Sequence, residues 1–179
     1  MNTIFLIRHA TPEWIRPDPE YQKPPGPPLS QQGLQEAQAL GTFLKEAGIQ
    51  MIYTSPLMRC LQSAQIVAEI TGALMKILEG LSEQLPEEKR AHVLQRLRPV
   101  LQEAIRSSRE TGPVALFTHG SPIVYLLSEL CMPDGEIKEL RHYDYQNPLP
   151  PAGAMRASRA TGDEGWKFEL VYIPNQVAK

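Results

Sequence analysis

The sequence predicts one α/β domain over residues 1–179, a three-layer α/β/α sandwich around a mainly parallel sheet. Two observations favour this fold class. The length of 179 residues and the apolar share of 42% suit a single globular domain. Short apolar runs of strand length alternate along the chain with longer stretches in which apolar residues recur at helical spacing. Such alternation is typical of a parallel sheet that helices cover on both faces.

The first elements follow from apolar runs and from proline and glycine positions. Residues 3–8 read as a short buried strand. Seven prolines between positions 12 and 28 exclude a helix there and predict a stiff loop. Ser30 is the expected N-cap of a helix over residues 31–47, and Gly48 suits its C-terminal end.

A second strand is expected over residues 51–54. Ser55 and Pro56 follow it, and they predict the N-cap and first-turn proline of a helix that ends at Gly72.

The second half of the chain is predicted to continue the alternation and to end in a hairpin. Its elements are a weak strand over residues 76–78, a helix from about Pro86 to Ser108, a strand over 114–118, a helix after His119, and strands over 154–160 and 166–173 joined by a turn at 161–165.

Composition excludes several classes of function. The formal net charge of -2 predicts no general attraction to nucleic acids or membranes. The start of the chain lacks the basic residues of a signal peptide, and the apolar runs are too short to span a bilayer, so we expect a cytoplasmic enzyme. Cys60 and Cys131 have no metal-site spacing and both lie in apolar helical patterns, which predicts two buried thiols.

Two predicted strands end in the same way. Arg8 and His9 follow the first strand, and His119 follows the strand over 114–118. Ligands of such folds bind beyond the carboxyl ends of the strands, so we expect both histidines at one edge of the sheet. A second Arg-His pair, Arg141 and His142, follows no apolar run and is read as surface or loop.

Arg59 adds a third element, because it lies in the first turn of the helix after the second strand. Free amide groups at a helix N-terminus suit a phosphate, and an arginine fork matches phosphate oxygens in two places. A histidine with an unprotonated nitrogen can attack phosphorus. The second histidine and the arginines can hold the charge that develops during transfer.

Together, these motifs resemble the histidine phosphatase superfamily, also called the phosphoglycerate mutase-like family. The resemblance extends from Met1 to about Leu130. It is carried by Arg8-His9, by Pro28-Leu29-Ser30 with Gly33 and Ala37, by Thr54 to Arg59, and by His119-Gly120. Ala10 is a departure, because the family usually has glycine after the first histidine.

The resemblance implies a phosphoglycerate mutase-like fold and a two-step mechanism. His9 would be phosphorylated, and water would then release phosphate from it. Arg8, Arg59 and His119 would bind the phosphoryl group. The proton donor is expected in Leu81-Ser82-Glu83, where Glu83 is preferred. Glu79, Glu87 and Glu88 are rivals for that role, and Ser30 could add a hydroxyl contact to the phosphate.

The predicted function is a phosphomonoester phosphatase for an unidentified small molecule, with inorganic phosphate as product and no metal or cofactor. A phosphoglycerate mutase is the first alternative, although the chain is shorter than we expect for glycolytic mutases. A non-catalytic phosphate-binding protein of the same fold is the second. The proline-rich loop either only covers the site or touches the substrate through Glu13, Trp14, Arg16, Tyr21 and Lys23.

Overall fold

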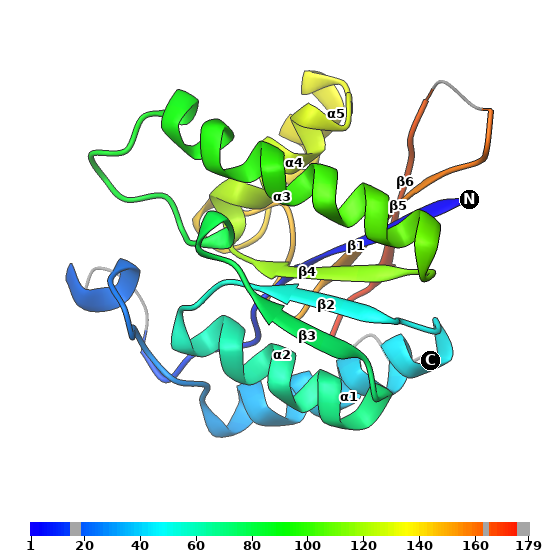
Figure 1. Ribbon diagram of the computed structural model, residues 1–179. Helices are drawn as coiled ribbons and strands as arrows, with labels where there is room; N and C mark the ends of the chain where they lie inside the picture. Colours follow the sequence, from blue (N-terminus) through cyan, green and yellow to red (C-terminus); the bar gives the residue numbers. More distant parts are fainter. Residues whose placement is uncertain (15–18, 163–164, 175–179) are drawn as a thin grey trace.

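A computed structural model describes residues 1–14, 19–162 and 165–174, and it confirms the expected α/β fold (Figure 1). Six strands form one sheet in the order β3-β2-β4-β1-β5-β6. The strands are β1 (Asn2–Arg8), β2 (Met51–Thr54), β3 (Leu74–Ile77), β4 (Val114–Thr118), β5 (Ala154–Arg159) and β6 (Lys167–Tyr172). The first four are mutually parallel, and β5 and β6 extend the sheet as an antiparallel hairpin.

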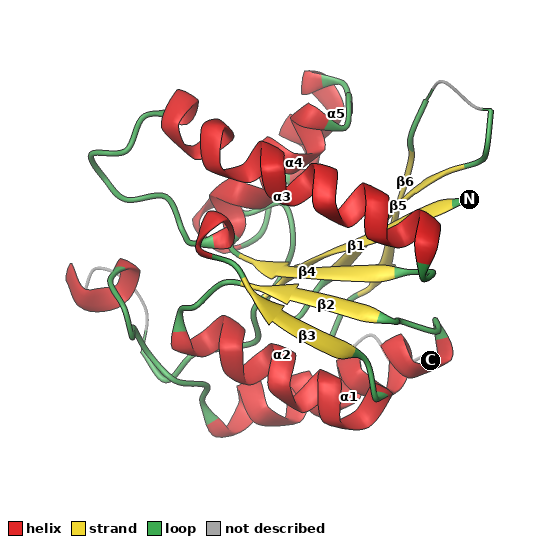
Figure 2. Cartoon of the chain, viewed as in Figure 1, coloured by secondary structure: helices red, strands yellow, loops and turns green. Residues whose placement is uncertain are grey.

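Helices cover both faces of the sheet (Figure 2). One face carries α1 (Gln31–Glu46) and α2 (Met58–Thr71). The other carries α3 (Arg90–Glu110) and α4 (Gly120–Glu129), with α5 (Asp134–Leu140) beside α4. Three short 3-10 turns complete the described elements: η1 (Pro19–Gln22), η2 (Glu79–Leu81) and η3 (Asp144–Gln146). No helix in the described ranges is long and apolar enough to cross a membrane.

Strand β1 shows why the sheet is buried on both sides. Successive side chains of a strand point to opposite faces. Ile4 and Leu6 join the core beneath α3 and α4, whereas Phe5 and Ile7 join the core against α1 and α2. The continuous apolar run therefore fills two cores at once, as the sequence predicted.

The helix ends agree with the sequence in two places and differ in one. Ser30 caps α1, because its Oγ accepts a hydrogen bond from the Gly33 amide at 3.0 Å. Gly72 ends α2 in the left-handed conformation, with φ of 75°. The expectation that Ser55 caps α2 was wrong: the helix begins at Met58 after Leu57, and Ser55 makes other contacts.

Other differences lie in polar segments. The helix expected from Pro86 begins only at Arg90, because residues 86–89 form a turn and extended chain. Neither α5 nor η3 was predicted, since both are short and mostly polar. Cys131 is exposed and lies in a turn after α4, so the prediction of a second buried thiol was wrong. Asp163 and Glu164, in the predicted hairpin turn, lie outside the described residues.

Candidate active site

The parallel register of β1 and β4 brings the two predicted histidines together. Arg8 lies opposite Thr118 in this register, so the next residue of each strand emerges at the same edge of the sheet. The His9 amide donates to the Thr118 carbonyl oxygen at 3.1 Å. The rings of His9 and His119 lie with their centroids 5.2 Å apart. The sheet thus fixes the separation of the two side chains.

The surroundings of His9 define which ring nitrogen can attack. Its side chain lies at the sheet edge and only 2% of the residue is exposed. Nδ1 lies 2.8 Å from the carbonyl oxygen of Ala10. A carbonyl oxygen only accepts, so in the neutral ring Nδ1 carries the proton and Nε2 carries the lone pair. This tautomer presents Nε2 as a nucleophile.

The Ala10 position needs no glycine. Ala10 is buried and its amide donates to Ser63 Oγ at 3.0 Å. It is not among the described residues with positive φ, so the chain turns away from His9 through backbone conformations that any residue adopts.

His119 is fully buried next to Ser55, which follows β2, and Cys60 of α2. Its Nε2 lies 2.9 Å from Ser55 Oγ and 3.4 Å from the Cys60 sulfur. Burial holds the pKa of His119 well below its ordinary value, and the positive charge of Arg59 and the neighbouring His9 add to the effect. His119 is therefore a neutral hydrogen-bonding group at neutral pH.

Arg8 forms an ion pair that the sequence did not suggest. Its Nη1 and Nη2 atoms donate to the two carboxylate oxygens of Asp144 at 2.6 and 2.7 Å, and Nη1 also donates to the Leu149 carbonyl at 3.0 Å. These hydrogen bonds from Arg8 lower the pKa of Asp144. Because Asp144 binds both terminal nitrogens of Arg8, the plane of the guanidinium group is fixed. The Nε atom of Arg8 takes no part in this ion pair.

Arg59 lies in the first turn of α2 and is fully buried. Its Nη1 donates to the Tyr21 carbonyl oxygen at 2.8 Å, and its guanidinium carbon lies 4.1 Å from the centroid of the Tyr21 ring. The proline-rich loop therefore holds Arg59 in place through Tyr21.

Three side-chain nitrogen atoms of these arginines lack partners. Among the described residues, the buried side-chain nitrogen and oxygen atoms without a hydrogen bond are Arg8 Nε, Arg59 Nε and Arg59 Nη2. A buried donor of this kind costs free energy unless something binds it. The three atoms belong to permanent cations beside two histidines, which is the donor set that suits an oxyanion.

Glu83 is the carboxyl group of its segment that reaches the site. It is 5% exposed and lines the cavity beside His9, and its Oε1 accepts from the Gln84 amide at 2.9 Å. Glu79 and Glu87 are exposed. Glu88 is ion-paired with Arg96 at 2.9 Å. None of these three rivals lines the cavity.

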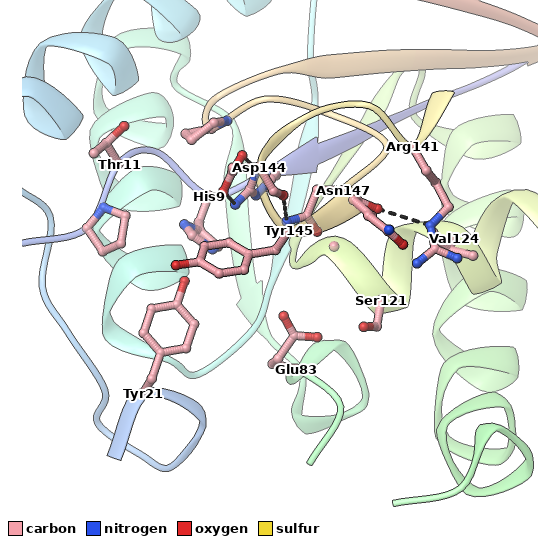
Figure 3. A pocket seen from close by; sticks show the side chains of 15 residues that line it. His9, Thr11, Tyr21, Glu83, Ser121, Val124, Arg141, Asp144, Tyr145 and Asn147 are labelled. Carbon is pink, nitrogen blue, oxygen red and sulfur yellow. Dashed lines mark hydrogen bonds and ion pairs between the residues drawn. The ribbon is translucent and has the colours of Figure 1, made fainter. Parts of the chain in front are cut away.

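The site opens into a cavity of about 230 Å³ (Figure 3). Its walls come from the carboxyl ends of the strands, the proline-rich loop, α4 and the segment after α5. The described lining residues are Arg8, His9, Thr11, Pro12, Tyr21, Glu83, Gly120, Ser121, Val124, Arg141, Asp144, Tyr145, Gln146, Asn147 and Pro151.

Some of the remaining predicted contact residues lie at the cavity and others do not. Tyr21 lines the cavity, and Trp14 packs edge-on against it with centroids 6.1 Å apart. Glu13 and Lys23 are exposed, and Arg16 lies outside the described residues. Ser30 is not a lining residue: besides capping α1, its hydroxyl donates to the Thr11 carbonyl oxygen at 3.0 Å.

Sequence reasoning missed the segment after α5. Arg141 was read as surface or loop, and it does lie in an exposed turn, yet it lines the cavity together with Asp144 and Tyr145. No motif or apolar period marks this segment. The ion pair of Asp144 with Arg8 joins positions 136 residues apart, which a local pattern cannot reveal.

Comparisons with known proteins agree with this architecture. The family model of the histidine phosphatase superfamily (branch 1) matches residues 4–85. That segment includes Arg8, His9, Arg59 and Glu83, and it ends before His119. Over these residues the chain is similar to the histidine phosphatase superfamily.

Curated relatives differ in their activities. A 2,3-bisphosphoglycerate-dependent phosphoglycerate mutase of Chlamydia trachomatis is 30% identical over 115 residues, which is 63% of this chain and 50% of the relative. Phosphoserine phosphatase 1 of Hydrogenobacter thermophilus is 38% identical over 69 residues, or 38% of this chain and 32% of the relative. The chain thus spans about half the length of the mutase that it matches and 32% of the length of the phosphatase.

A solved structure resembles the whole fold. Mycobacterial glucosyl-3-phosphoglycerate phosphatase superposes with a TM-score of 0.73 at 20% identity, covering 95% of this chain and 98% of that one. At this identity the likeness concerns the fold.

Proposed function

We propose that this chain is a phosphomonoester phosphatase with His9 as nucleophile. The observation that carries the proposal is the set of three buried nitrogen donors of Arg8 and Arg59 that have no partner among the described residues, beside a histidine whose Nε2 carries the lone pair. These groups suit a phosphoryl group because the arginine donors match its oxygens and the imidazole can attack phosphorus.

In the first step, His9 Nε2 attacks phosphorus and the bond to the leaving oxygen breaks. Arg8 and Arg59 donate to the phosphoryl oxygens, and their charges balance the charge that spreads over those oxygens. Neutral His119 offers a further N–H donor. The protonated carboxyl group of Glu83 gives its proton to the leaving oxygen.

In the second step, a water molecule attacks the phosphorus of phospho-His9. The Glu83 carboxylate takes a proton from that water, the N–P bond breaks, and His9 and inorganic phosphate are released. The proton that Glu83 gives in the first step is therefore replaced in the second.

A substrate panel tests the proposal. Wild type and His9→Ala are compared for release of free phosphate from sugar phosphates, nucleotides and phosphoamino acids. We expect release by wild type and none above background by the variant. Equal release by both would remove His9 as the nucleophile.

A mutase is the second candidate, because the Chlamydia relative is one. Interconversion of phosphoglycerates without net phosphate release would favour it. Phosphate binding without turnover on any substrate would favour a non-catalytic binding protein. The cytoplasmic location expected from the sequence stays a prediction.

Glu83 has a test of its own. Glu83→Gln keeps the shape of the side chain and removes its proton chemistry. We expect hydrolysis of alkyl phosphates, which have poor leaving groups, to slow about 100-fold or more, and aryl phosphates to be affected less. Glu79→Gln is the control, because that carboxyl group is exposed. Equal effects on both substrate types would exclude Glu83 as the acid.

A further inference from the structure

Residues 141–147, here called the strap, form one wall of the cavity and are tightly braced. Asp144 fastens the strap to Arg8. Within the strap, Arg141 Nε donates to the Gln146 carbonyl at 3.0 Å and Asn147 Nδ2 donates to the Asp144 carbonyl at 2.7 Å. The strap is therefore held at a fixed distance from the proposed phosphoryl site.

Gly120 explains how the strap approaches His119. A Cβ atom at Gly120 would lie 1.3 Å from Asn147 Oδ1, so only glycine allows the Asn147 side chain to sit there. Gly120, the glycine of the strand-His-Gly motif, thus leaves the space that Asn147 of the strap occupies.

Tyr145 stands out within the strap. Its backbone has φ of 52° and ψ of 31°, and Gln146 follows with φ of 57°. Left-handed backbone is uncommon for a bulky residue and costs free energy that the surroundings must supply. The Tyr145 residue is 58% exposed. An exposed aromatic side chain on strained backbone beside a catalytic cavity points to a binding role.

Figure 3 shows where the ring lies. Tyr145 extends across the cavity next to His9, and Tyr21 points into the same space from the proline-rich loop. Asp144, the residue before Tyr145, is the one paired with Arg8, so Tyr145 lies beside the arginine that is proposed to hold the phosphoryl group.

We propose that Tyr145 forms a leaving-group subsite that selects phosphomonoesters whose leaving group carries a flat ring. This proposal rests on the proposed function of the site. The face of the Tyr145 ring offers stacking to a planar group, and Pro12, Val124 and Pro151 add apolar surface to the same cavity. An acidic leaving group at Arg141, on the same strap, is the competing possibility that the test includes.

The test measures binding, so it does not depend on turnover. Benzylphosphonate and n-butylphosphonate carry the same anionic phosphonate group. It is attached to a flat ring in the first compound and to a flexible apolar chain in the second. We expect wild type to bind the benzyl compound about twofold to twelvefold more tightly, the range of an aromatic pair. Tyr145→Ala should remove that preference. Tyr143→Ala is the matched control, because Tyr143 is in the strap and does not line the cavity.

Tyr145→Gly separates a binding role from a structural one. Glycine adopts left-handed backbone at no steric cost, so this variant should lose the benzyl preference while its melting temperature stays unchanged or rises by about 2–4 °C. A clear fall in melting temperature would show that the ring supports the fold, and it would overturn the proposal.

Other outcomes also decide. A benzyl preference that survives Tyr145→Ala overturns the subsite. The subsite is also overturned if wild type prefers 3-phosphonopropionate to both probes and Arg141→Gln removes that preference. Hydrolysis of benzyl phosphate and n-butyl phosphate is followed in parallel. If wild type releases phosphate from neither ester and from no member of the substrate panel but binds both phosphonates, the proposed function fails, and the binding ratio still decides whether the subsite exists.

Discussion

Replacing Arg59 by methionine separates the contribution of this residue to stability from its contribution to binding. Arg59 is fully buried, yet its Nε and Nη2 atoms have no partner among the described residues. Methionine keeps an unbranched apolar stem and removes every N–H group. If the site is built for an anion, the empty protein gains little from the arginine.

The magnitude follows from the contacts. Each unsatisfied buried donor costs about 1–3 kcal/mol, so removing both stabilises the protein by about 2–6 kcal/mol. The same change loses the Arg59 hydrogen bond to the Tyr21 carbonyl and the stacking on the Tyr21 ring, together about 2–5 kcal/mol. The two terms nearly cancel. We therefore expect a melting temperature within about 5 °C of wild type.

Thermal unfolding with and without phosphate is the assay. Phosphate at 100 times its Kd should stabilise wild type by about 2.7 kcal/mol, or about 5–10 °C. Arg59→Met should lose most of that shift. Arg98→Met is the control, because Arg98 is exposed, pairs with Glu129 and should keep the full shift. A loss of more than about 10 °C without phosphate, or a full phosphate shift in Arg59→Met, would refute the reasoning.

Three further predictions concern neighbouring groups. Asp144→Asn should lower kcat/KM about tenfold with little loss of stability, because Asp144 orients Arg8 but is 43% exposed; steady-state kinetics with unchanged kcat/KM would contradict this. The pKa of His119 is depressed in the folded state, so the unfolded state binds the extra proton as pH falls below about 6.5. Urea midpoints of wild type should therefore drop between pH 7 and 5, and those of His119→Gln should drop less; parallel curves would argue against it. Burial raises the pKa of the Cys60 thiol to about 12, so a thiol reagent should modify only Cys131 in the native protein and both cysteines after unfolding, as mass spectrometry can measure.

Much of the fold could be predicted from local pattern. The continuous apolar run of β1 predicts a strand buried on both faces, and its side chains do enter two cores. A mainly parallel sheet places the carboxyl ends of its strands at one edge, and β1 and β4 are neighbours there. The approach of His9 to His119 could be expected because it depends only on these strong patterns.

The rest depends on contacts that no local pattern contains. Ser55 resembles a helix cap in the sequence, yet its hydroxyl bonds to His119, which follows the neighbouring strand β4. Asp144 and Tyr145 lie in a short polar strap whose shape is set by pairing with Arg8, far away along the chain. Long-range ion pairs and strained loop residues of this kind are what single-sequence reasoning misses.

Trapping the phosphoenzyme tests the central claim about His9 most directly. The protein is mixed with a good substrate such as 4-nitrophenyl phosphate, quenched within milliseconds in alkali, where phosphohistidine survives, and digested for mass spectrometry. We predict phosphate on the peptide that contains His9 in wild type, and more of it in Glu83→Gln if release by water becomes slower than transfer. Turnover with no phosphate on His9, or with phosphate on another residue, would contradict the account.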